Sequence, residues 1–272
     1  MPELPEVETV RRSLSEILIN KQIIDVEVRY NKIIENVSVD DFINALKGQT
    51  ILDIRRKGKY LIFVLNDYYL VSHLRMEGKF FDYTDLDYGK HDHIIFIFKN
   101  FNLRYNDTRK FGRMDLFKIS DDIFNLKPLS KLGLEPFDEA LTKDYLFNKF
   151  SKLNKTVKEA LLDQSIMCGL GNIYVDEVLF MSKLHPEQNA SSLTMVDYEN
   201  IIHNSIEVLT KAINMGGTTI KSFASSHNHT GLFQNELLVH TKKICPICNT
   251  QIEKIRVGGR GTYLCPNCQK LK

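Results

Sequence analysis

The 272-residue sequence predicts an α+β protein with more than one domain. Three observations lead to this prediction. Short runs rich in β-branched and aromatic residues occupy residues 23–119, helical periodicity replaces them after residue 136, and a separate cysteine-bearing segment closes the chain. No apolar run approaches the ~20 residues that a membrane span requires. The acidic start does not resemble a signal peptide, so we expect a cytoplasmic protein.

The elements are predicted from hydrophobic spacing. Apolar residues at helical intervals from Val7 to Leu18 predict a helix at about residues 5–19. Short runs rich in β-branched or aromatic residues predict strands at 23–28, 60–65, 69–73, 94–98, 103–105 and 114–119, and their number and spacing predict a β-sandwich or barrel. Helices are predicted at 145–153, 157–163, 173–181 and 198–215, the last one ending at Gly216-Gly217. The polar segment Gly216–Gly231 that follows predicts a loop.

The first residues allow two interpretations. Because Pro2 is small, we expect Met1 to be removed, which leaves a proline with a free secondary amine at the N-terminus. An α-amino group with a pKa near ~7.7–8.0 is partly unprotonated at neutral pH and nucleophilic, and Glu3 and Glu6 offer carboxyls for acid–base work. The alternative is an ordinary helix start, in which proline and acidic residues favour the first turn.

Four of the five cysteines form two C-x-x-C pairs separated by sixteen residues: Cys245, Cys248, Cys265 and Cys268. This spacing predicts one structural Zn²⁺ ion with no open coordination position. Iron is chemically possible with the same ligands. A disulfide is disfavoured by the reducing compartment that we expect. The fifth cysteine, Cys168, is expected to be a small buried residue.

The C-terminal segment is strongly basic. Residues 241–272 hold seven basic residues and one acidic residue, a net charge of +6, so the first 240 residues carry −4 of the total of +2. The segment is therefore either a polyanion-binding module or a basic solubilising tail. Residues 256–263, with Gly258-Gly259 followed by Arg260, predict a hairpin that suits a nucleic-acid groove or backbone. A solvated turn is the alternative.

Three motifs together resemble the bacterial formamidopyrimidine-DNA glycosylases over the whole chain: Pro2–Val10 (PELPEVETV), Gly169–Tyr174 (GLGNIY) and the cysteine pairs. The resemblance implies removal of 8-oxoguanine and ring-opened purines from double-stranded DNA, followed by strand cleavage. It implies an N-terminal β-sandwich with a flanking helix (1–133), a helix–two-turn–helix domain (134–236) with a lesion-capping loop near 216–231, and a zinc-ribbon hairpin (237–272). A monomer is expected.

The same resemblance implies the catalytic residues. Pro2 would attack the sugar C1′ and form a Schiff base, Glu3 would act as general acid, and Glu6 would support the pocket. Lys59, in a Lys-Tyr-Leu segment, matches the proton donor for β-elimination. Arg260 matches the arginine of δ-elimination and phosphate binding.

The residues implied to handle DNA form two sets. Met76, Arg109 and Phe111 would fill the stack that a flipped nucleotide leaves, with Arg109 facing the orphaned cytosine. For Met76 and Phe111 the alternative is core packing. The other implied contacts are His91, Lys155, Lys158, Asn172 and His73. His91 and His93 share one side of a predicted strand, but the resemblance implies a DNA contact for His91 rather than a metal.

The sequence departs from the family at three positions. Arg75 and Glu77 flank Met76 where Gly and Ser are usual, and His240 stands where Tyr is common, which leaves a phosphate contact in doubt. One alternative function is an endonuclease VIII-like glycosylase for oxidised pyrimidines; Leu4 and the intact Arg-x-Phe-Gly segment favour the purine enzymes. The other is a non-enzymatic zinc-ribbon protein that binds damaged DNA, which would not need Pro2, Glu3 and Lys59.

Overall fold

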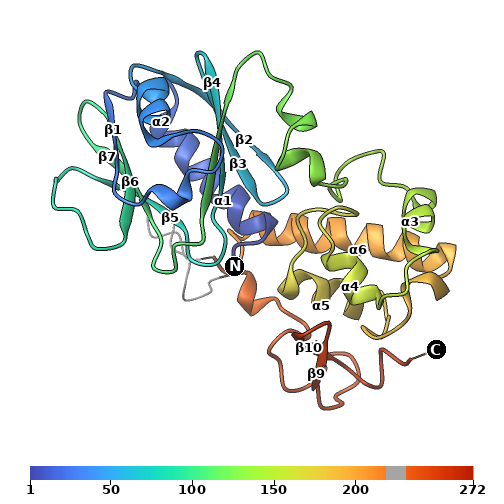
Figure 1. Ribbon diagram of the computed structural model, residues 1–272. Coiled ribbons are helices and arrows are strands. Elements are labelled where there is room, and N and C mark those ends of the chain that lie inside the picture. Colours follow the sequence, from blue (N-terminus) through green and yellow to red (C-terminus); the bar gives the residue numbers. More distant parts are fainter. Residues whose placement is uncertain (219–230, 272) are drawn as a thin grey trace. The chain divides into compact units, whose positions relative to one another are not determined.

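The structure, a computed structural model, describes residues 1–218 and 231–271 (Figure 1). These residues form two compact units. Unit 1 comprises Met1–Ser130 with Gly216–Gly231, and unit 2 comprises Lys131–Met215 with Leu232–Lys272. The three-domain boundaries expected from the sequence stay a prediction. Among the described residues, no helix is both long and apolar enough to cross a membrane.

The described part of unit 1 contains two four-stranded antiparallel sheets, and the predicted β-sandwich with a flanking helix is confirmed. The sheets have the strand orders β1-β6-β7-β5 and β2-β3-β4-β8. The strands are β1 (Asp25–Val28), β2 (Ile51–Lys57), β3 (Tyr60–Leu65), β4 (Tyr68–His73), β5 (Lys79–Tyr83), β6 (Asp92–Ile97), β7 (Asn102–Asn106) and β8 (Arg113–Lys118).

One apolar core holds the two sheets together. Phe63 of β3 meets Phe80 of β5 edge to face, with ring centroids 5.7 Å apart. Helix α1 (Leu4–Leu18) packs on β2 and β3, and α2 (Val39–Leu46) packs on β1. The apolar stripe of α1 enters the same core, which fixes the helix start on the sheet that contains the β2–β3 turn.

Helices dominate unit 2, as predicted. They are α3 (Lys143–Phe150), α4 (Val157–Leu162), α5 (Asn172–Met181) and α6 (Met195–Asn214). Threonines at 142, 156 and 194 cap α3, α4 and α6 by accepting backbone N–H groups. The central helix α5 is buried from Ile173 to Phe180 and contacts α4, α6 and β10. Short 3₁₀ turns lie at Asn31–Ile33, Ile123–Asn125, Leu129–Lys131, Ala190–Ser192 and Phe233–Asn235.

The C-terminal hairpin joins β9 (Glu253–Val257) and β10 (Arg260–Leu264). Gly258 and Gly259 both have positive φ angles, +53° and +77°, as a two-residue type I′ turn requires. The predicted hairpin is therefore confirmed, with Arg260 exposed directly after its turn.

Three elements lie outside the predicted segments: β2, β5 and α2. In β2, charged residues such as Asp53 and Arg55 alternate with apolar residues, so its apolar pattern is short and interrupted. It forms a strand because Ile51 and Ile54 enter the sandwich core and β3 pairs with its backbone.

Candidate active site, metal centre and nucleic-acid interface

The residues predicted at the N-terminus form a rigid, buried turn. Pro2 is buried, and Glu3 and Glu6 are 3% and 1% exposed. The two glutamates form a reciprocal capping box at the start of α1, in which Glu6 Oε2 accepts the Glu3 N–H at 2.9 Å and the Glu3 carboxylate accepts the Glu6 N–H. This arrangement fixes the backbone directly after Pro2 and holds two carboxyls beside it.

The second oxygen of Glu6 reaches a segment more than two hundred residues away. Glu6 Oε1 accepts the Thr218 N–H at 2.8 Å and the Thr218 hydroxyl at 3.0 Å. Gly217 has a φ of +75°, and a Cβ there would lie 2.7 Å from Glu6 Oε1, so only glycine fits this approach. The predicted lesion-capping loop follows directly, but residues 219–230 lie outside the described residues.

Lys59 lies in the tight turn between β2 and β3, after Gly58, and is largely buried. Arg56 links this turn to α1, because it donates to the Gly58 carbonyl at 3.0 Å and pairs with Glu8 at 3.2 Å. Burial by itself would raise the pKa of Glu8, but hydrogen bonds from neighbouring arginines outweigh it and lower that pKa. Pro2, Glu3, Glu6 and Lys59 thus all lie in unit 1, on two elements that pack together.

His73 is placed next to the β2–β3 turn by strand pairing with Tyr60. Burial, helped by the charges of Arg75 and Lys59, lowers the pKa of His73 to about 3, so the ring is neutral at pH 7. Its Nδ1 accepts the Arg75 N–H at 2.9 Å, which leaves the proton on Nε2. His73 can therefore offer a phosphate one neutral N–H donor and no charge.

The turn that carries Arg109 and Phe111 is organised by a residue that the sequence analysis missed. Asp107 is buried, and its carboxylate accepts the backbone N–H groups of Arg109, Phe111 and Gly112 at 2.8–2.9 Å. The Arg109 guanidinium lies 4.7 Å from the centre of the Phe111 ring. The available signal was an aspartate directly after a strand and before a glycine turn.

Phe111 and Met76 are 46% and 37% exposed. Both side chains are therefore too exposed for the core-packing alternative, because side chains packed in a core are almost fully buried. Together with the exposed Arg109, they are available to a nucleic acid.

His91, directly before β6, and His93, within it, have different surroundings. His93 Nε2 lies 2.8 Å from the Asp107 carbonyl, and burial lowers the His93 pKa. His91 is half-buried, and its Nδ1, which is shielded from solvent, has no hydrogen-bond partner within the described part of the chain. Since His93 is only 3% exposed, His91 is the more accessible ring of the two.

The implied phosphate contacts of unit 2 separate into exposed and buried residues. Lys155 is exposed, and its Nζ lies 3.6 Å from Oδ2 of Asp163. Asn172, the first residue of α5, donates from Nδ2 to the Gly261 carbonyl at 2.9 Å. Lys158 is 0% exposed, and its Nζ lies 2.6 Å from Asp176. A buried ammonium committed to a carboxylate does not reach a phosphate, so we leave Lys158 out of the proposed DNA contacts.

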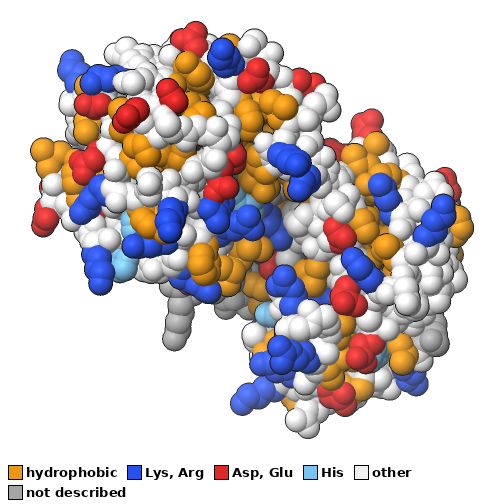
Figure 2. Space-filling model, viewed as in Figure 1, with side chains coloured by type: hydrophobic (Ala, Val, Ile, Leu, Met, Phe, Trp, Pro, Cys, Tyr) orange, Lys and Arg blue, Asp and Glu red, His pale blue; other side chains and the backbone are white. Residues whose placement is uncertain are grey.

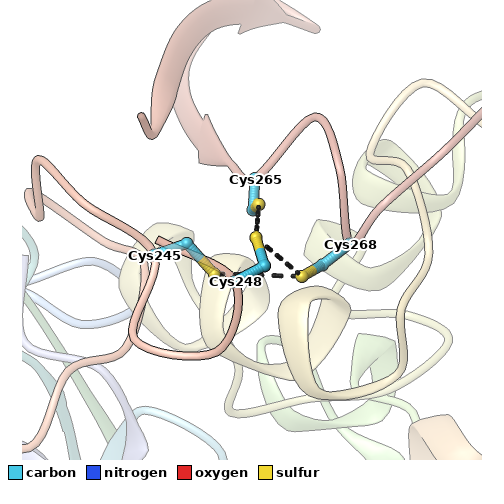
Figure 3. A group of neighbouring side chains, drawn as sticks. All are labelled: Cys245, Cys248, Cys265 and Cys268. Atoms are coloured by element: carbon cyan, nitrogen blue, oxygen red, sulfur yellow. Dashed lines mark hydrogen bonds between the residues drawn. The ribbon is translucent and has the colours of Figure 1, made fainter. Parts of the chain in front are cut away.

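Four cysteine sulfurs converge at the base of the hairpin (Figure 3). All four lie within 4.8 Å of one another, with Sγ–Sγ separations such as 3.5 Å for Cys248–Cys265 and 3.8 Å for Cys245–Cys268. A tetrahedral Zn²⁺ with Zn–S bonds of about 2.3 Å requires sulfurs about 3.8 Å apart. The geometry of the four sulfurs fits a structural metal ion.

The cysteines of the cluster have different surroundings. A hydrogen bond with Thr250 lowers the pKa of Cys248 to about 5, whereas burial and then the neighbouring sulfurs raise the pKa of Cys268 to about 12. A metal ion bound by all four sulfurs would hold them as thiolates. Cys168 lies apart from this cluster, buried, with its thiol donating to the Gly133 carbonyl at 3.2 Å.

The module around the cysteines presents positive charge. Figure 2 shows blue Lys and Arg side chains over the C-terminal hairpin. Its exposed basic residues are Lys243, Lys254, Arg256, Arg260 and Lys270. This surface suits a polyanion.

Comparisons with known proteins cover the whole chain. Family models match residues 1–114 (Formamidopyrimidine-DNA glycosylase N-terminal domain), 132–224 (Formamidopyrimidine-DNA glycosylase H2TH domain) and 243–271 (Zinc finger found in FPG and IleRS). The Formamidopyrimidine-DNA glycosylase of Shouchella clausii is 50% identical over 99% of both chains. The corresponding protein of Oceanobacillus iheyensis is 44% identical, over 100% of this chain and 99% of the relative.

Solved structures agree with the sequence comparisons. A complex of the Lactococcus lactis Fpg with DNA that contains an abasic site matches with a TM-score of 0.92 and 41% identity, over 99% of this chain and 100% of that chain. A complex of the wild-type Lactococcus lactis Fpg with DNA that contains N7-benzyl-Fapy-dG also has a TM-score of 0.92, at 42% identity and the same coverage.

Proposed function

The chain belongs to the formamidopyrimidine-DNA glycosylase family, and we propose that it removes oxidised purines such as 8-oxoguanine and formamidopyrimidines and then cuts the strand as an AP lyase. The family assigns it to the glycosylases of base-excision repair, with DNA as partner. The purine preference, the lyase step and the residues involved are our proposals. The monomeric state and the cytoplasmic location stay predictions.

The observation that carries the mechanism is the buried pair of carboxyls next to Pro2. The lone pair of the Pro2 amine forms a bond to the sugar C1′ while the bond from C1′ to the base breaks, and the proton that the amine then loses goes to the departing base. Glu3 gives a proton to the ring oxygen O4′ as the C1′–O4′ bond opens, which leaves an iminium linkage between Pro2 and the sugar. Glu6 holds the backbone of Glu3 in place through the capping box.

Strand cleavage then follows by elimination. The Glu3 carboxylate left by the preceding step takes a proton from C2′, the C3′–O bond breaks, and Lys59 gives a proton to the departing 3′-phosphate in this β-elimination. A second elimination expels the 5′-phosphate, and we assign Arg260 to it because its exposed guanidinium can bind phosphate in a bidentate manner. Met76, Arg109 and Phe111 would fill the duplex after the lesion is flipped, and His91, Lys155, Asn172 and His73 would contact the backbone.

The metal in the cysteine cluster is proposed to be a single Zn²⁺. Thiolate ligands at this spacing favour zinc. The ion would keep the hairpin folded and would take no part in the chemistry, because four protein ligands leave no open position.

The mechanism is tested by trapping with borohydride on a duplex that contains 8-oxoguanine opposite cytosine. We expect a covalent adduct that maps to Pro2. A preparation that retains an N-terminal extension, in which the Pro2 nitrogen is an amide, should form none while it still binds the duplex. Proteolytic removal of the extension to expose Pro2 should restore the adduct.

The result that contradicts the mechanism is an adduct of ordinary yield from the extended protein, or one that maps to another residue. A parallel duplex with an oxidised pyrimidine tests the endonuclease VIII-like alternative. Faster excision of the pyrimidine than of 8-oxoguanine would replace the proposed substrate class. Binding without excision of either base would favour the non-enzymatic alternative.

A further inference from the structure

One buried carboxylate on α5 has no part in the mechanism described above. Asp176 is 1% exposed, and groups from separate chain segments reach its two oxygens. Lys158 Nζ, from α4, lies 2.6 Å from Oδ1. His240 Nδ1 lies 2.7 Å from Oδ2, and the Tyr263 N–H of β10 donates to the same oxygen at 3.2 Å. Asp176 therefore connects α4, α5, β10 and the segment before the cysteine cluster.

The contact with Tyr263 lies on the outer edge of the hairpin. β10 pairs with β9 through residues such as Arg260 and Thr262, so the backbone groups of Gly261 and Tyr263 point to the other side. On that side the Gly261 carbonyl accepts from Asn172 Nδ2 at 2.9 Å, and the Tyr263 N–H donates to Asp176. Two consecutive outward positions of β10 are thus satisfied by side chains of α5.

Asn172 and Asp176 are four residues apart on α5, so they lie on one face of the helix. One side chain presents a donor and the other an acceptor, which complements the edge of β10 as a neighbouring strand would. α5 and β10 lie in contact (Figure 1). Arg260 is the residue directly before Gly261, so this edge contact also determines where Arg260 is held.

The turn of the hairpin is held against a second helix. A Cβ on Gly258 would lie 2.6 Å from Cγ of Glu159, in the first turn of α4. The His240 ring packs against the Tyr263 ring with centroids 4.9 Å apart. Together, these contacts hold the hairpin in three places: at the Gly258 turn, along the outer edge of β10 and at the Tyr263 ring.

We propose that Asp176 is a positioning residue that holds β10, and with it Arg260, in register on α5. This inference rests on the proposed function, which gives Arg260 its role in δ-elimination. A carboxylate suits this place because its two oxygens accept from several donors at once, while the charge of Lys158 compensates for its burial. A displacement of the guanidinium by about 1 Å would slow a reaction that depends on its position by up to about 100-fold.

The test replaces both charges together by apolar side chains, in the double variant Lys158→Met/Asp176→Leu, since such replacements of buried ion pairs often preserve folding. The substrate is a duplex with one abasic site. We expect borohydride trapping within about twofold of wild type, and a fraction of δ-elimination product that falls by at least about fivefold. Amide hydrogen exchange in residues 260–264 should accelerate by at least about tenfold, while that of α6 stays unchanged.

The matched control is Asp197→Ala, which removes a capping carboxylate from α6 in the same unit. It should loosen the start of α6 and leave both the δ-product fraction and the exchange of β10 unchanged. An unchanged δ-product fraction, or unchanged exchange in β10, in the folded double variant would overturn the positioning role.

If the double variant does not fold, Asp176→Asn undergoes the same two measurements. The asparagine keeps one acceptor and loses the charge, so we expect the δ-product fraction to fall and the exchange of residues 260–264 to accelerate, each by at least about twofold. If neither quantity changes, the proposal is overturned. Failure of the wild-type protein to trap or cleave the abasic duplex would refute the proposed function instead. The exchange measurement would then still decide whether Asp176 holds the hairpin.

Discussion

At the scale of single residues, the structure relies on carboxylates that accept backbone N–H groups. Glu6 accepts the N–H groups of Glu3 and Thr218, and Asp107 accepts N–H groups of the turn that carries Arg109. Glu177 accepts three consecutive N–H groups, from Leu238 to His240. Buried N–H groups must be paired, and an ionised acceptor pairs them more strongly than a neutral one. Glu6 and Asp107 in this way hold the backbone beside side chains that we assign to chemistry and DNA binding.

Substitution of Asp107 tests this view. In Asp107→Ala, three N–H groups would lose their acceptor, and we expect the free energy of unfolding to fall by about 2–4 kcal/mol. The displaced turn should also weaken binding of a lesion duplex by at least about tenfold, since Arg109 and Phe111 would lose their orientation. Chemical denaturation and fluorescence anisotropy measure the two effects.

The control is Asp122→Ala, which removes an exposed cap from the 3₁₀ turn at Ile123–Asn125. This substitution should lower the free energy of unfolding by less than about 1 kcal/mol and leave DNA affinity unchanged. Equal effects of the two substitutions on affinity would show that the Asp107 carboxylate does not organise the binding turn.

At the scale of elements, we expect the cysteine module to depend on a bound metal and on its packing against α5. Its small core consists of Phe180 of α5, Val239, Ile252 and two of the cysteines. A core of this size stabilises too little to fold the segment alone, whereas zinc binding contributes about 10–16 kcal/mol in comparable modules.

Removal of the metal should therefore unfold the hairpin and leave the sandwich of unit 1 intact. We expect a chelator to lower DNA affinity by at least about tenfold and to raise hydrogen exchange in residues 245–268, with exchange in β3 and β4 unchanged. Elemental mass spectrometry should find one Zn²⁺ per chain before chelation. Cys168→Ser, outside the cluster, should retain that ion, and full DNA affinity in the metal-free protein would contradict the prediction.

At the scale of the whole molecule, the net charge is small, but the positive charge is distributed unevenly along the chain. The net charge is only +2, so attraction to DNA depends on where the cations lie. The exposed basic residues of the hairpin and Lys155 of unit 2 are the main candidates for phosphate contacts. Affinity should fall steeply with salt, because each neutralised phosphate releases counterions.

Lys155→Ala should lower affinity for all duplex sequences alike and reduce the slope of log Kd against log salt by about 1. Lys47→Ala, an exposed lysine of unit 1 that pairs with Asp25, serves as the control and should leave the slope unchanged. Titrations at several salt concentrations measure both. An unchanged slope for Lys155→Ala would remove Lys155 from the phosphate contacts.

Local patterns in the sequence were sufficient for much of the fold. The strand at 60–65 follows from its run of β-branched and aromatic residues, and the helices predicted from residue 145 onward follow from apolar residues at helical intervals. β2 and β5 were missed because charged outward residues interrupt their short apolar runs and pairing with β3 and β7 decides their conformation.

The sequence by itself determined the four cysteines of the cluster, the glycine turn of the hairpin and the family motifs, since each is recognised from residues that lie close together in the chain. Only the tertiary structure decided which charges are buried and what they contact. The family resemblance implied a phosphate contact for Lys158, but Asp176, 18 residues further along the chain, holds it, and Asp176 contacts His240, 64 residues away in the sequence. Such partners are set by the packing of helices on the hairpin, and no local spacing encodes that packing.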